Sequence, residues 1–179
     1  CNFSSLHFDS PEFPELVAAI ADRHNVPHAL LELEITESAI MRNPQIVCAQ
    51  VLRLKERGFM IAIDDFGSGY SSLGQLQQLM ADVLKLDRSF ERRGMVGTRE
   101  RIVIGNVIHM AGELGMQVIC EGVENAKQAE MLIELGCYYA QGFYYAKPMP
   151  RDVFERLLEK GKVLQDEKEN KKGAWQRKP

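Results

Sequence analysis

Two adjacent carboxylates, Asp64 and Asp65, are the residues of this 179-residue sequence whose types and spacing best suit chemistry. They follow an apolar run and precede a loop that contains Gly67 and Gly69. Neighbouring side chains of a strand point to opposite faces, so the two acids converge only if the strand ends there and the chain turns. Glycine permits that turn because it accepts positive φ. The pair suits one or two hard metal ions, and from this stretch alone a surface Asp-Asp turn is the equal alternative.

Further polar residues fall where the other predicted strands end. In chain order, the six strand ends carry Asn2, Glu34 with Glu37, Asp64 with Asp65, Lys85 with Asp87, Glu121 with Glu124, and Gln141. In a TIM barrel, the carboxyl ends of the strands form the active-site face. Four or more carboxylates in one mouth raise one another's pKa values unless a cation compensates them. A ligand set with oxygen atoms and neither His nor Cys favours Mg²⁺ or Mn²⁺ over zinc.

Lys85 brings a cation to the same predicted edge, on the strand that follows the two aspartates in the chain. Its amine can orient or deprotonate a water molecule, which would make it part of the chemistry. It can equally neutralise the surrounding acids and take no part in the reaction. The sequence leaves both roles open.

The elements that must position these residues alternate along the chain. After a first strand that ends near Asn2, strands are predicted over residues 30–35, 59–63, 82–87, 116–120 and 138–141. Helices are predicted over residues 11–24, 44–57, 72–79, 99–114, 125–136 and 150–160, with a polar loop over 88–98. Their boundaries rest on local signals. Two N-cap-plus-proline starts are Ser10-Pro11 and Asn43-Pro44, residues 125–128 resemble a capping box, and glycines 58 and 115 mark helix ends.

Six strand–helix repeats with short connections predict parallel strands joined by right-handed crossovers. An open Rossmann-type sheet and a TIM barrel both fit this order, but no GxGxxG follows the first strand, which argues against a dinucleotide-binding domain. A whole barrel has eight units in about 250 residues. We therefore expect a TIM-type (β/α) barrel of the α/β class, with about six of its eight units in this chain. The first residue is Cys and not Met, so we expect the other two units upstream in a longer protein.

Composition excludes several classes of function. The net charge of −3 argues against bulk nucleic-acid binding through a basic surface. The four cysteines are scattered without CxxC spacing, which favours reduced thiols in a cytoplasmic protein over a disulfide framework. No apolar run in the chain is long enough to cross a membrane, and attachment of the parent protein through upstream segments stays open. Residues 1–160 are predicted to be one domain and 161–179 a charged tail or linker.

Five linked motifs resemble those of a known family. They are Glu34-Ile35-Thr36-Glu37-Ser38, the run from Asp64 to Leu73, Leu84-Lys85-Leu86-Asp87, Glu121-Gly122-Val123-Glu124 and Gln141-Gly142-Phe143. Their order and spacing are similar to those of EAL domains, which are bacterial cyclic-di-GMP phosphodiesterases, and the resemblance extends from Asn2 to about Leu158. It implies a modified TIM barrel that opens cyclic di-GMP to linear pGpG with two metal ions, Mg²⁺ or Mn²⁺, and that pairs as a homodimer.

The resemblance also assigns roles to individual residues. The metal ligands would be Asn2, Glu34, Asp64, Asp65 and Glu121, with Asp64 bridging the ions. Lys85 would activate the attacking water, and Glu37 would anchor a regulatory loop made of Phe66, Gly67, Ser68, Gly69, Tyr70, Ser71 and Ser72. Asp87, Glu124 and Gln141 would form an outer ring around the water, the loop and the substrate. The catalytic residues would be Lys85, Glu37 and Glu124.

One departure from the family pattern bears on function. The Glu-Ala-Leu motif is absent from this chain, and we expect its glutamate, a metal ligand, upstream of residue 1. The first hypothesis is that the parent protein is an active phosphodiesterase. The second is a receptor that binds cyclic di-GMP without hydrolysis, although such relatives usually have eroded metal ligands and none is eroded here. The third is that this chain alone is inactive, because six units leave an unclosed sheet with exposed edges.

Overall fold

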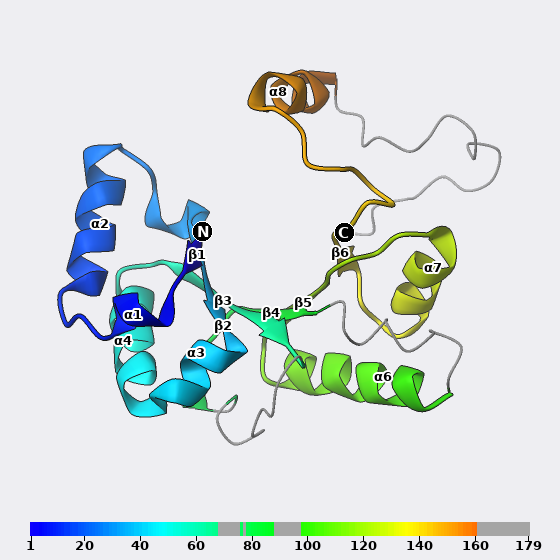
Figure 1. Ribbon diagram of the computed structural model, residues 1–179, viewed down its shortest axis with the longest axis horizontal. Coiled ribbons are helices and arrows are strands. Elements are labelled where there is room, and N and C mark those ends of the chain that lie inside the picture. Colours follow the sequence, from blue (N-terminus) through cyan, green and yellow to red (C-terminus); the bar gives the residue numbers. More distant parts are fainter. Residues whose placement is uncertain (68–75, 77, 88–97, 161–179) are drawn as a thin grey trace.

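Six parallel strands form the centre of the computed structural model, which describes residues 1–67, 76, 78–87 and 98–160 (Figure 1). Their order in the sheet is the order of the chain, β1-β2-β3-β4-β5-β6. The strands are β1 (Asn2–Phe3), β2 (Glu32–Thr36), β3 (Met60–Phe66), β4 (Val83–Leu86), β5 (Gln117–Cys120) and β6 (Tyr139–Ala140). A doubly wound Rossmann sheet reverses its strand order at a switch point. The sequential order therefore excludes that alternative and confirms the predicted α/β arrangement.

Among the described residues, helices follow every strand except β3, and they lie around the sheet. They are α1 (Ser5–Phe8), α2 (Phe13–Arg23), α3 (Glu37–Arg42), α4 (Pro44–Glu56), α6 (Thr98–Glu113), α7 (Ala126–Glu134) and α8 (Arg151–Lys160), with a 3-10 turn η1 (His28–Leu30). In Figure 1, α1 to α4 gather beside the first strands, and α6 and α7 lie beside the last ones. The helix α8 stands apart, at the end of an extended segment that follows β6.

The core lies where the strands meet the helices. All four residues of β4 are buried, as are Ile61 and Ile63 of β3. Burial on both faces explains why these strands read as apolar runs and not as an alternating pattern. On α4, Val47, Val51 and Leu54 recur at helical spacing and are at most 2% exposed. These contacts fix the helix layer against the sheet and leave the strand ends to carry polar groups.

Several predicted boundaries are confirmed. Asn125 caps α7 through a complete capping box, in which its side chain accepts from the amide of Gln128 and the Gln128 side chain accepts in return. Gly58 and Gly115 follow α4 and α6 with φ of +87° and +77°, the conformation expected of a glycine that ends a helix. The starts of α4 at Pro44 and α8 at Arg151 also agree with the sequence.

The predicted start of α2 at Ser10-Pro11 is wrong. The helix begins at Phe13, and residues 10–13 form a turn in which the Phe13 amide donates to the Ser10 carbonyl at 3.2 Å. The reason is Pro14, which has no amide hydrogen. In a helix beginning at Pro11 it would leave the Ser10 carbonyl without its first helical bond, whereas at the second helical position it leaves none unmade.

Two short helices, α1 and α3, are absent from the sequence prediction. Both start at a hydroxyl cap: Ser4 accepts from Leu6, and Thr36 accepts from Ala39 at 3.3 Å. These caps were the signal that the sequence offered. Most of the predicted helix over 72–79, the predicted loop over 88–98 and the predicted tail lie outside the described residues. None of the described helices is both long and apolar enough to pass through a lipid bilayer.

Candidate metal and catalytic centre

The strand β3 continues past both aspartates to Phe66, which corrects the prediction that it ends at Asp64. Ile63 pairs with Leu84 and Phe66 pairs with Leu86, so β3 holds one residue more than β4 between these two pairs. This extra residue is a β-bulge. Asp65 adopts a φ of +55°, a conformation that Asp tolerates better than most residues. The bulge, and not a turn at Gly67, breaks the alternation of the strand.

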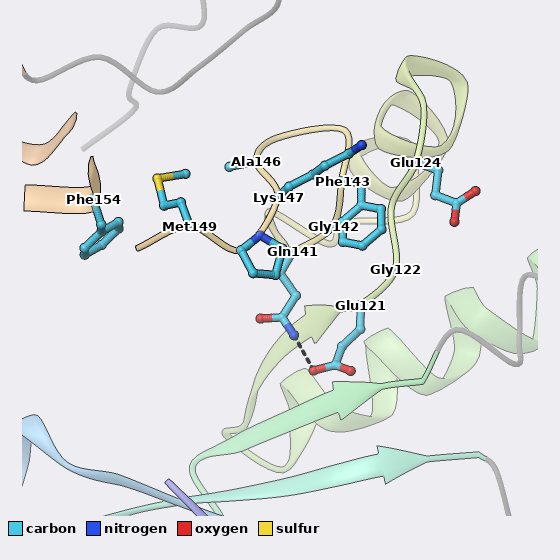
Figure 2. A pocket seen from close by; sticks show the side chains of 11 residues that line it. Glu121, Gly122, Glu124, Gln141, Gly142, Phe143, Ala146, Lys147, Met149 and Phe154 are labelled. Carbon is cyan, nitrogen blue, oxygen red and sulfur yellow. Dashed lines mark hydrogen bonds between the residues drawn. The ribbon is translucent and has the colours of Figure 1, made fainter. Parts of the chain in front are cut away.

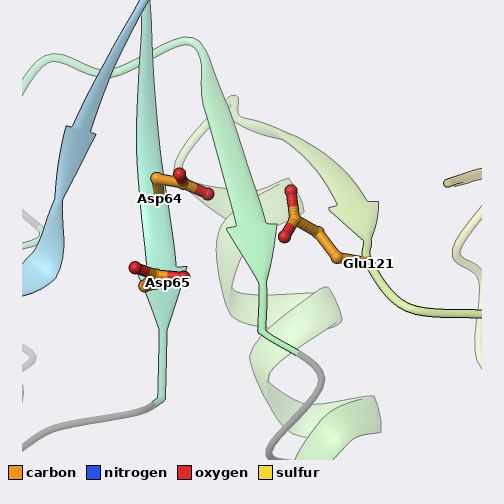
Figure 3. Close-up of side chains that lie close together, drawn as sticks. All are labelled: Asp64, Asp65 and Glu121. Atoms are coloured by element: carbon orange, nitrogen blue, oxygen red, sulfur yellow. The ribbon is translucent and has the colours of Figure 1, made fainter. Parts of the chain in front are cut away.

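The bulge lets both aspartates face the end of the sheet that Glu121 reaches from β5. Figure 3 shows Asp64 and Asp65 on one strand and the Glu121 carboxylate opposite them, across β4. One carboxylate oxygen of each of the three lies within 4.8 Å of the others. This spacing allows the three carboxylates to share a cation, and the three acids converge as the sequence predicted.

Lys85 lies at the centre of the cluster. Its Nζ is 2.9 Å from Glu34 Oε2, 2.9 Å from Glu121 Oε1 and 3.1 Å from Asp64 Oδ1, and its side chain is 8% exposed. These groups come from four neighbouring strands or strand ends. They meet because every second residue of a strand faces the same side of the sheet. One ammonium therefore joins three carboxylates that are far apart in the chain.

Burial and charge act against each other in this cluster. Burial alone would lower the pKa of Lys85, but its contacts with Glu121, Glu34 and Asp64 outweigh burial and raise that pKa. The pKa of Glu121 is raised by burial, and the opposing effect of Lys85 does not cancel it. The pKa of Asp65 is raised by burial and then by the charges of Asp64 and Asp87. The acids are thus only partly compensated by Lys85.

The donor atoms fit a hard divalent cation. All three clustered side chains offer carboxylate oxygens, which Mg²⁺ and Mn²⁺ prefer. Within the described residues, Asp64 Oδ1 is buried and accepts no well-aligned hydrogen bond, although Lys85 Nζ is 3.1 Å away. The Lys85 ammonium compensates this oxygen only in part, because one ammonium serves three carboxylates. The surplus of acids over this one cation favours a bound metal.

The remaining predicted ligands lie on the same side of the sheet. Glu34 of β2 contacts Lys85, and Asn2 of β1 pairs with Glu34 in the register of the two strands. Asn2 is exposed at the edge of the sheet. The five predicted ligands therefore occur on β1, β2, β3 and the end of β5, with Lys85 on the intervening β4.

Glu37 is the first residue of α3 and ties the end of β3 in place. Its Oε2 accepts a 2.8 Å hydrogen bond from the amide of Gly67, and its side chain is buried. Within the described part of the chain, its other oxygen has no hydrogen-bond partner. The contact joins Glu37 to the first residues of the predicted regulatory loop, Phe66 and Gly67, whereas Ser68 to Ser72 lie outside the described residues.

Gln141 and Glu124 border a cavity next to the cluster (Figure 2). The Gln141 side chain donates to Glu121 Oε1 at 2.6 Å, so it joins the carboxylate group directly. The cavity has a volume of about 510 Å³ and runs from Glu121 to the start of α8. Glu124 lies on its rim, with its backbone amide donating to the Gln128 side chain at 2.6 Å. Glu124 is thus placed at the cavity and not in the three-carboxylate group.

Two backbone segments cross tightly behind this cavity. The amide of Val123 donates to the Gln141 carbonyl at 3.1 Å, and the amide of Tyr144 donates to the Val123 carbonyl at 2.9 Å. Gly142 lies between these bonds, where a Cβ atom would be 2.2 Å from the Val123 oxygen and 2.3 Å from its nitrogen. Only glycine allows this approach. The crossing fixes the loops that carry Glu121 and Gln141 relative to each other.

Asp87 follows β4, and its amide donates to the Phe66 carbonyl at 3.3 Å. Its charge is one of the causes that raise the pKa of Asp65. Asp87 therefore belongs to the same acidic mouth.

Residues 1–148 of the chain match the model of the EAL domain family. This range contains every site residue described above. The chain belongs to the EAL domain family. Among curated proteins, an uncharacterized protein of Azorhizobium caulinodans is 42% identical over 158 residues, which are 88% of this chain and 22% of that protein. The cyclic di-GMP phosphodiesterase RocR of Pseudomonas aeruginosa is 38% identical over 140 residues, which are 78% of this chain and 36% of RocR.

Solved EAL structures share its fold. The EAL domain of Mycobacterium smegmatis DcpA superposes with a TM-score of 0.84 at 37% identity, over 91% of this chain and 73% of that one. The PaMucR phosphodiesterase in its c-di-GMP complex gives a TM-score of 0.80 at 35% identity, over 86% of this chain and 62% of that one. The predicted TIM-type α/β fold is confirmed. The chain spans about a fifth of the Azorhizobium protein and about a third of RocR.

The sequence prediction missed the apolar side of the cavity in this EAL domain. Its lining includes Phe143, Lys147, Met149 and Phe154, and the Lys147 Nζ lies 5.8 Å from the centre of the Phe143 ring. Phe143, Lys147 and Met149 lie in the irregular segment between β6 and α8, and Phe154 lies in α8, so no strand end singles them out. The signal available was compositional: an aromatic residue and a lysine that follow a predicted site residue, Gln141, within six positions.

Proposed function

We propose that the protein containing this EAL domain hydrolyses cyclic di-GMP to linear pGpG. The observation that carries the proposal is the convergence of Lys85 with Glu34, Asp64 and Glu121, beside Asp65, at the carboxyl end of the sheet. The name of RocR as a cyclic di-GMP phosphodiesterase and the c-di-GMP complex of PaMucR support the choice of substrate. An acidic centre of this kind suits phosphodiester cleavage because it can hold divalent cations, which stabilise the negative charge that the reaction develops on oxygen.

Two divalent ions, Mg²⁺ or Mn²⁺, would be held by Asn2, Glu34, Asp64, Asp65 and Glu121. When bound, such ions polarise a phosphodiester and lower the pKa of a water molecule. The carboxylates of the chain supply the negative charge that retains the ions and set where the phosphate can lie. The buried Asp64 oxygen supports a central position for that residue.

Lys85 would orient the attacking water. In the metal-free centre, its contacts with three carboxylates raise its pKa, so it keeps its proton at neutral pH. A protonated amine donates hydrogen bonds and cannot accept the proton of the water, which favours positioning and charge compensation over general-base catalysis. Of the two roles that the sequence left open, the electrostatic one is therefore the role we propose.

The surrounding residues would hold the substrate and the loop. The cavity of about 510 Å³ beside Glu121 and Gln141 is within the range of small-molecule sites. We assign Gln141, Asp87 and Glu124 to the ring that contacts water and substrate. Glu37, through the Gly67 amide, would link the loop over residues 66–72 to the metal ligands of β3.

Assembly and location complete the proposal. We propose a homodimer, as the family resemblance implies, and a cytoplasmic location, which four free thiols support.

Turnover by the full-length protein tests the proposal. Purified protein is incubated with cyclic di-GMP and Mg²⁺ or Mn²⁺, and the linear product is separated by chromatography. We expect turnover, and we expect Asp64→Asn to abolish it. Asp152→Asn, at an exposed position of α8, is the matched control and retains activity. No turnover with either metal refutes the enzyme assignment, and tight metal-independent binding without product assigns the protein to the receptor class instead.

A further inference from the structure

Two buried cysteines that the proposed reaction does not use are in contact. Cys120 ends β5, and Cys137 lies between α7 and β6. Their Sγ atoms are 3.4 Å apart, and the residues are 4% and 3% exposed. We propose that Cys120 and Cys137 form a reversible redox pair, which a small hydroperoxide oxidises to a disulfide within the folded domain.

The surroundings of the pair hold the two sulfur atoms together. Cys137 Sγ lies 3.2 Å from the Tyr139 carbonyl oxygen and 3.5 Å from the Val118 carbonyl oxygen. These contacts direct the side chain along the β5–β6 edge toward Cys120. A disulfide bond is about 2.05 Å long, so the sulfurs must approach by about 1.4 Å for the bond to form. The two sulfur atoms are thus already in contact in the reduced domain.

The chemistry balances with the peroxide as the only co-reactant. One sulfur, as thiolate, attacks a peroxide oxygen; the O–O bond breaks, the sulfur becomes a sulfenic acid, and the other oxygen leaves as water or alcohol. The second thiol then attacks the sulfenic sulfur, the S–O bond breaks, and a water molecule leaves. The peroxide gains two electrons, and the two cysteines lose them together with their thiol hydrogens. A dithiol reductant reverses the reaction by thiol–disulfide exchange.

Burial makes the pair selective for small oxidants. Bulky thiol reagents need an exposed sulfur, whereas hydrogen peroxide is hardly larger than water. Cys1 is exposed and Cys48 is half-buried, so bulky reagents reach Cys1 most readily and the buried pair least readily. A bulky maleimide should therefore label Cys1 first, and peroxide should convert the buried pair to a disulfide.

The position of the pair connects it to the candidate metal centre. Cys120 directly precedes Glu121, on the opposite face of the strand, and Cys137 leads into β6, after which Gln141 donates to Glu121. The disulfide would join the two elements that carry these side chains, from behind the acidic mouth. The proposal itself concerns the sulfur chemistry and does not depend on the hydrolase activity.

The test uses the full protein with Cys1→Ser and Cys48→Ser, so that Cys120 and Cys137 are the pair under study. After treatment with hydrogen peroxide, the native mass, free thiols and peptides linked after proteolysis are measured, with circular dichroism to confirm that the fold is kept. We expect loss of two hydrogen atoms, loss of both thiols, a peptide cross-link between residues 120 and 137, and recovery with a dithiol reductant. Adding Cys120→Ser is the matched control and should give oxygen adducts on Cys137 instead.

Two results would overturn the proposal. One is that both thiols stay free at peroxide concentrations that oxidise Cys1 in the unsubstituted protein. The other is that oxygen adducts accumulate, or that the cross-link forms only as the fold is lost. If the serine variant fails to fold, peptide mapping of the unsubstituted protein answers the same question, because the cross-linked residues are identified directly.

Discussion

Replacement of Lys85 by Met tests whether the acidic cluster depends on this one ammonium. Met keeps a similar length and removes the charge, which leaves Glu34, Asp64 and Glu121 facing one another without their shared partner. Each contact near 3 Å has a gross attraction of about 5 kcal/mol at an effective dielectric constant of 20. Desolvation of the buried ammonium offsets much of the sum, and removal of one member of a buried ion pair costs a net of about 3–5 kcal/mol.

This loss is large enough to measure by thermal unfolding. For a domain of this size, about 1 kcal/mol changes the midpoint by roughly 2–4 °C, so the Lys85→Met protein should unfold roughly 6–20 °C below wild type in the presence of a chelator at neutral pH. Excess Mg²⁺ or Mn²⁺ should reduce the difference, because a divalent cation compensates the same carboxylates. Lys127→Met, at an exposed position of α7, is the control and should change the midpoint little.

The pH dependence of the difference has a definite sign. The folded-state pKa of Lys85 is raised, so its contribution is fully present below its ordinary pKa of about 10.4 and is lost only as the pH rises through the folded value. In the variant, the carboxyl of Glu121, whose pKa is already raised by burial, no longer has the opposing effect of Lys85. It takes up a proton more readily, so the difference should narrow as the pH falls from about 7 toward 5. An unfolding midpoint equal to that of wild type at neutral pH, in chelator, would refute the reasoning.

Three further substitutions test individual contacts. Gly142→Ala should separate the crossed segments behind the cavity and weaken Mn²⁺ binding measured by calorimetry. Gly112→Ala is the control, because its Cβ would meet open space, and it should leave Mn²⁺ affinity unchanged. Equal Mn²⁺ affinities of the two variants would contradict the role of the crossing. Glu37→Ala should release the Gly67 amide and increase its hydrogen exchange, and unchanged protection would show that Glu37 is no anchor. Asn125→Ala should lower the free energy of unfolding by about 1 kcal/mol in urea titrations, through loss of the α7 cap; a change below about 0.3 kcal/mol would contradict that role.

Much of the strand arrangement could be predicted because it depends on local patterns. Apolar runs that end in polar residues marked the carboxyl ends of β2 to β5, and the regular alternation with helices implied parallel neighbours. Once these ends lie at one edge, the convergence of Glu34, Asp64 and Glu121 follows from the period of two along each strand. The residues of the acidic centre could thus be predicted from the sequence without its geometry.

Other features depend on contacts that the sequence does not encode locally. The rule of alternation predicted that β3 must end at the aspartates, whereas the bulge at Asp65 lets the strand continue to Phe66. The bulge depends on how β3 pairs with β4, and the sequence of β3 alone does not show that pairing. The open question about Lys85 was also non-local, because its pKa depends on three residues from other parts of the chain. The cavity after β6 depends likewise on where an irregular segment passes.

The backbone at Asp65 has a consequence for how such a domain can diverge. Its positive φ suits Asn nearly as well as Asp and disfavours β-branched or bulky residues. An Asp65→Asn change would therefore remove one negative charge from the acidic mouth and leave the path of the chain unaltered. A library restricted to Asp, Asn and Gly at position 65 would therefore vary the charge of the acidic mouth while the backbone conformation stays accessible to each residue.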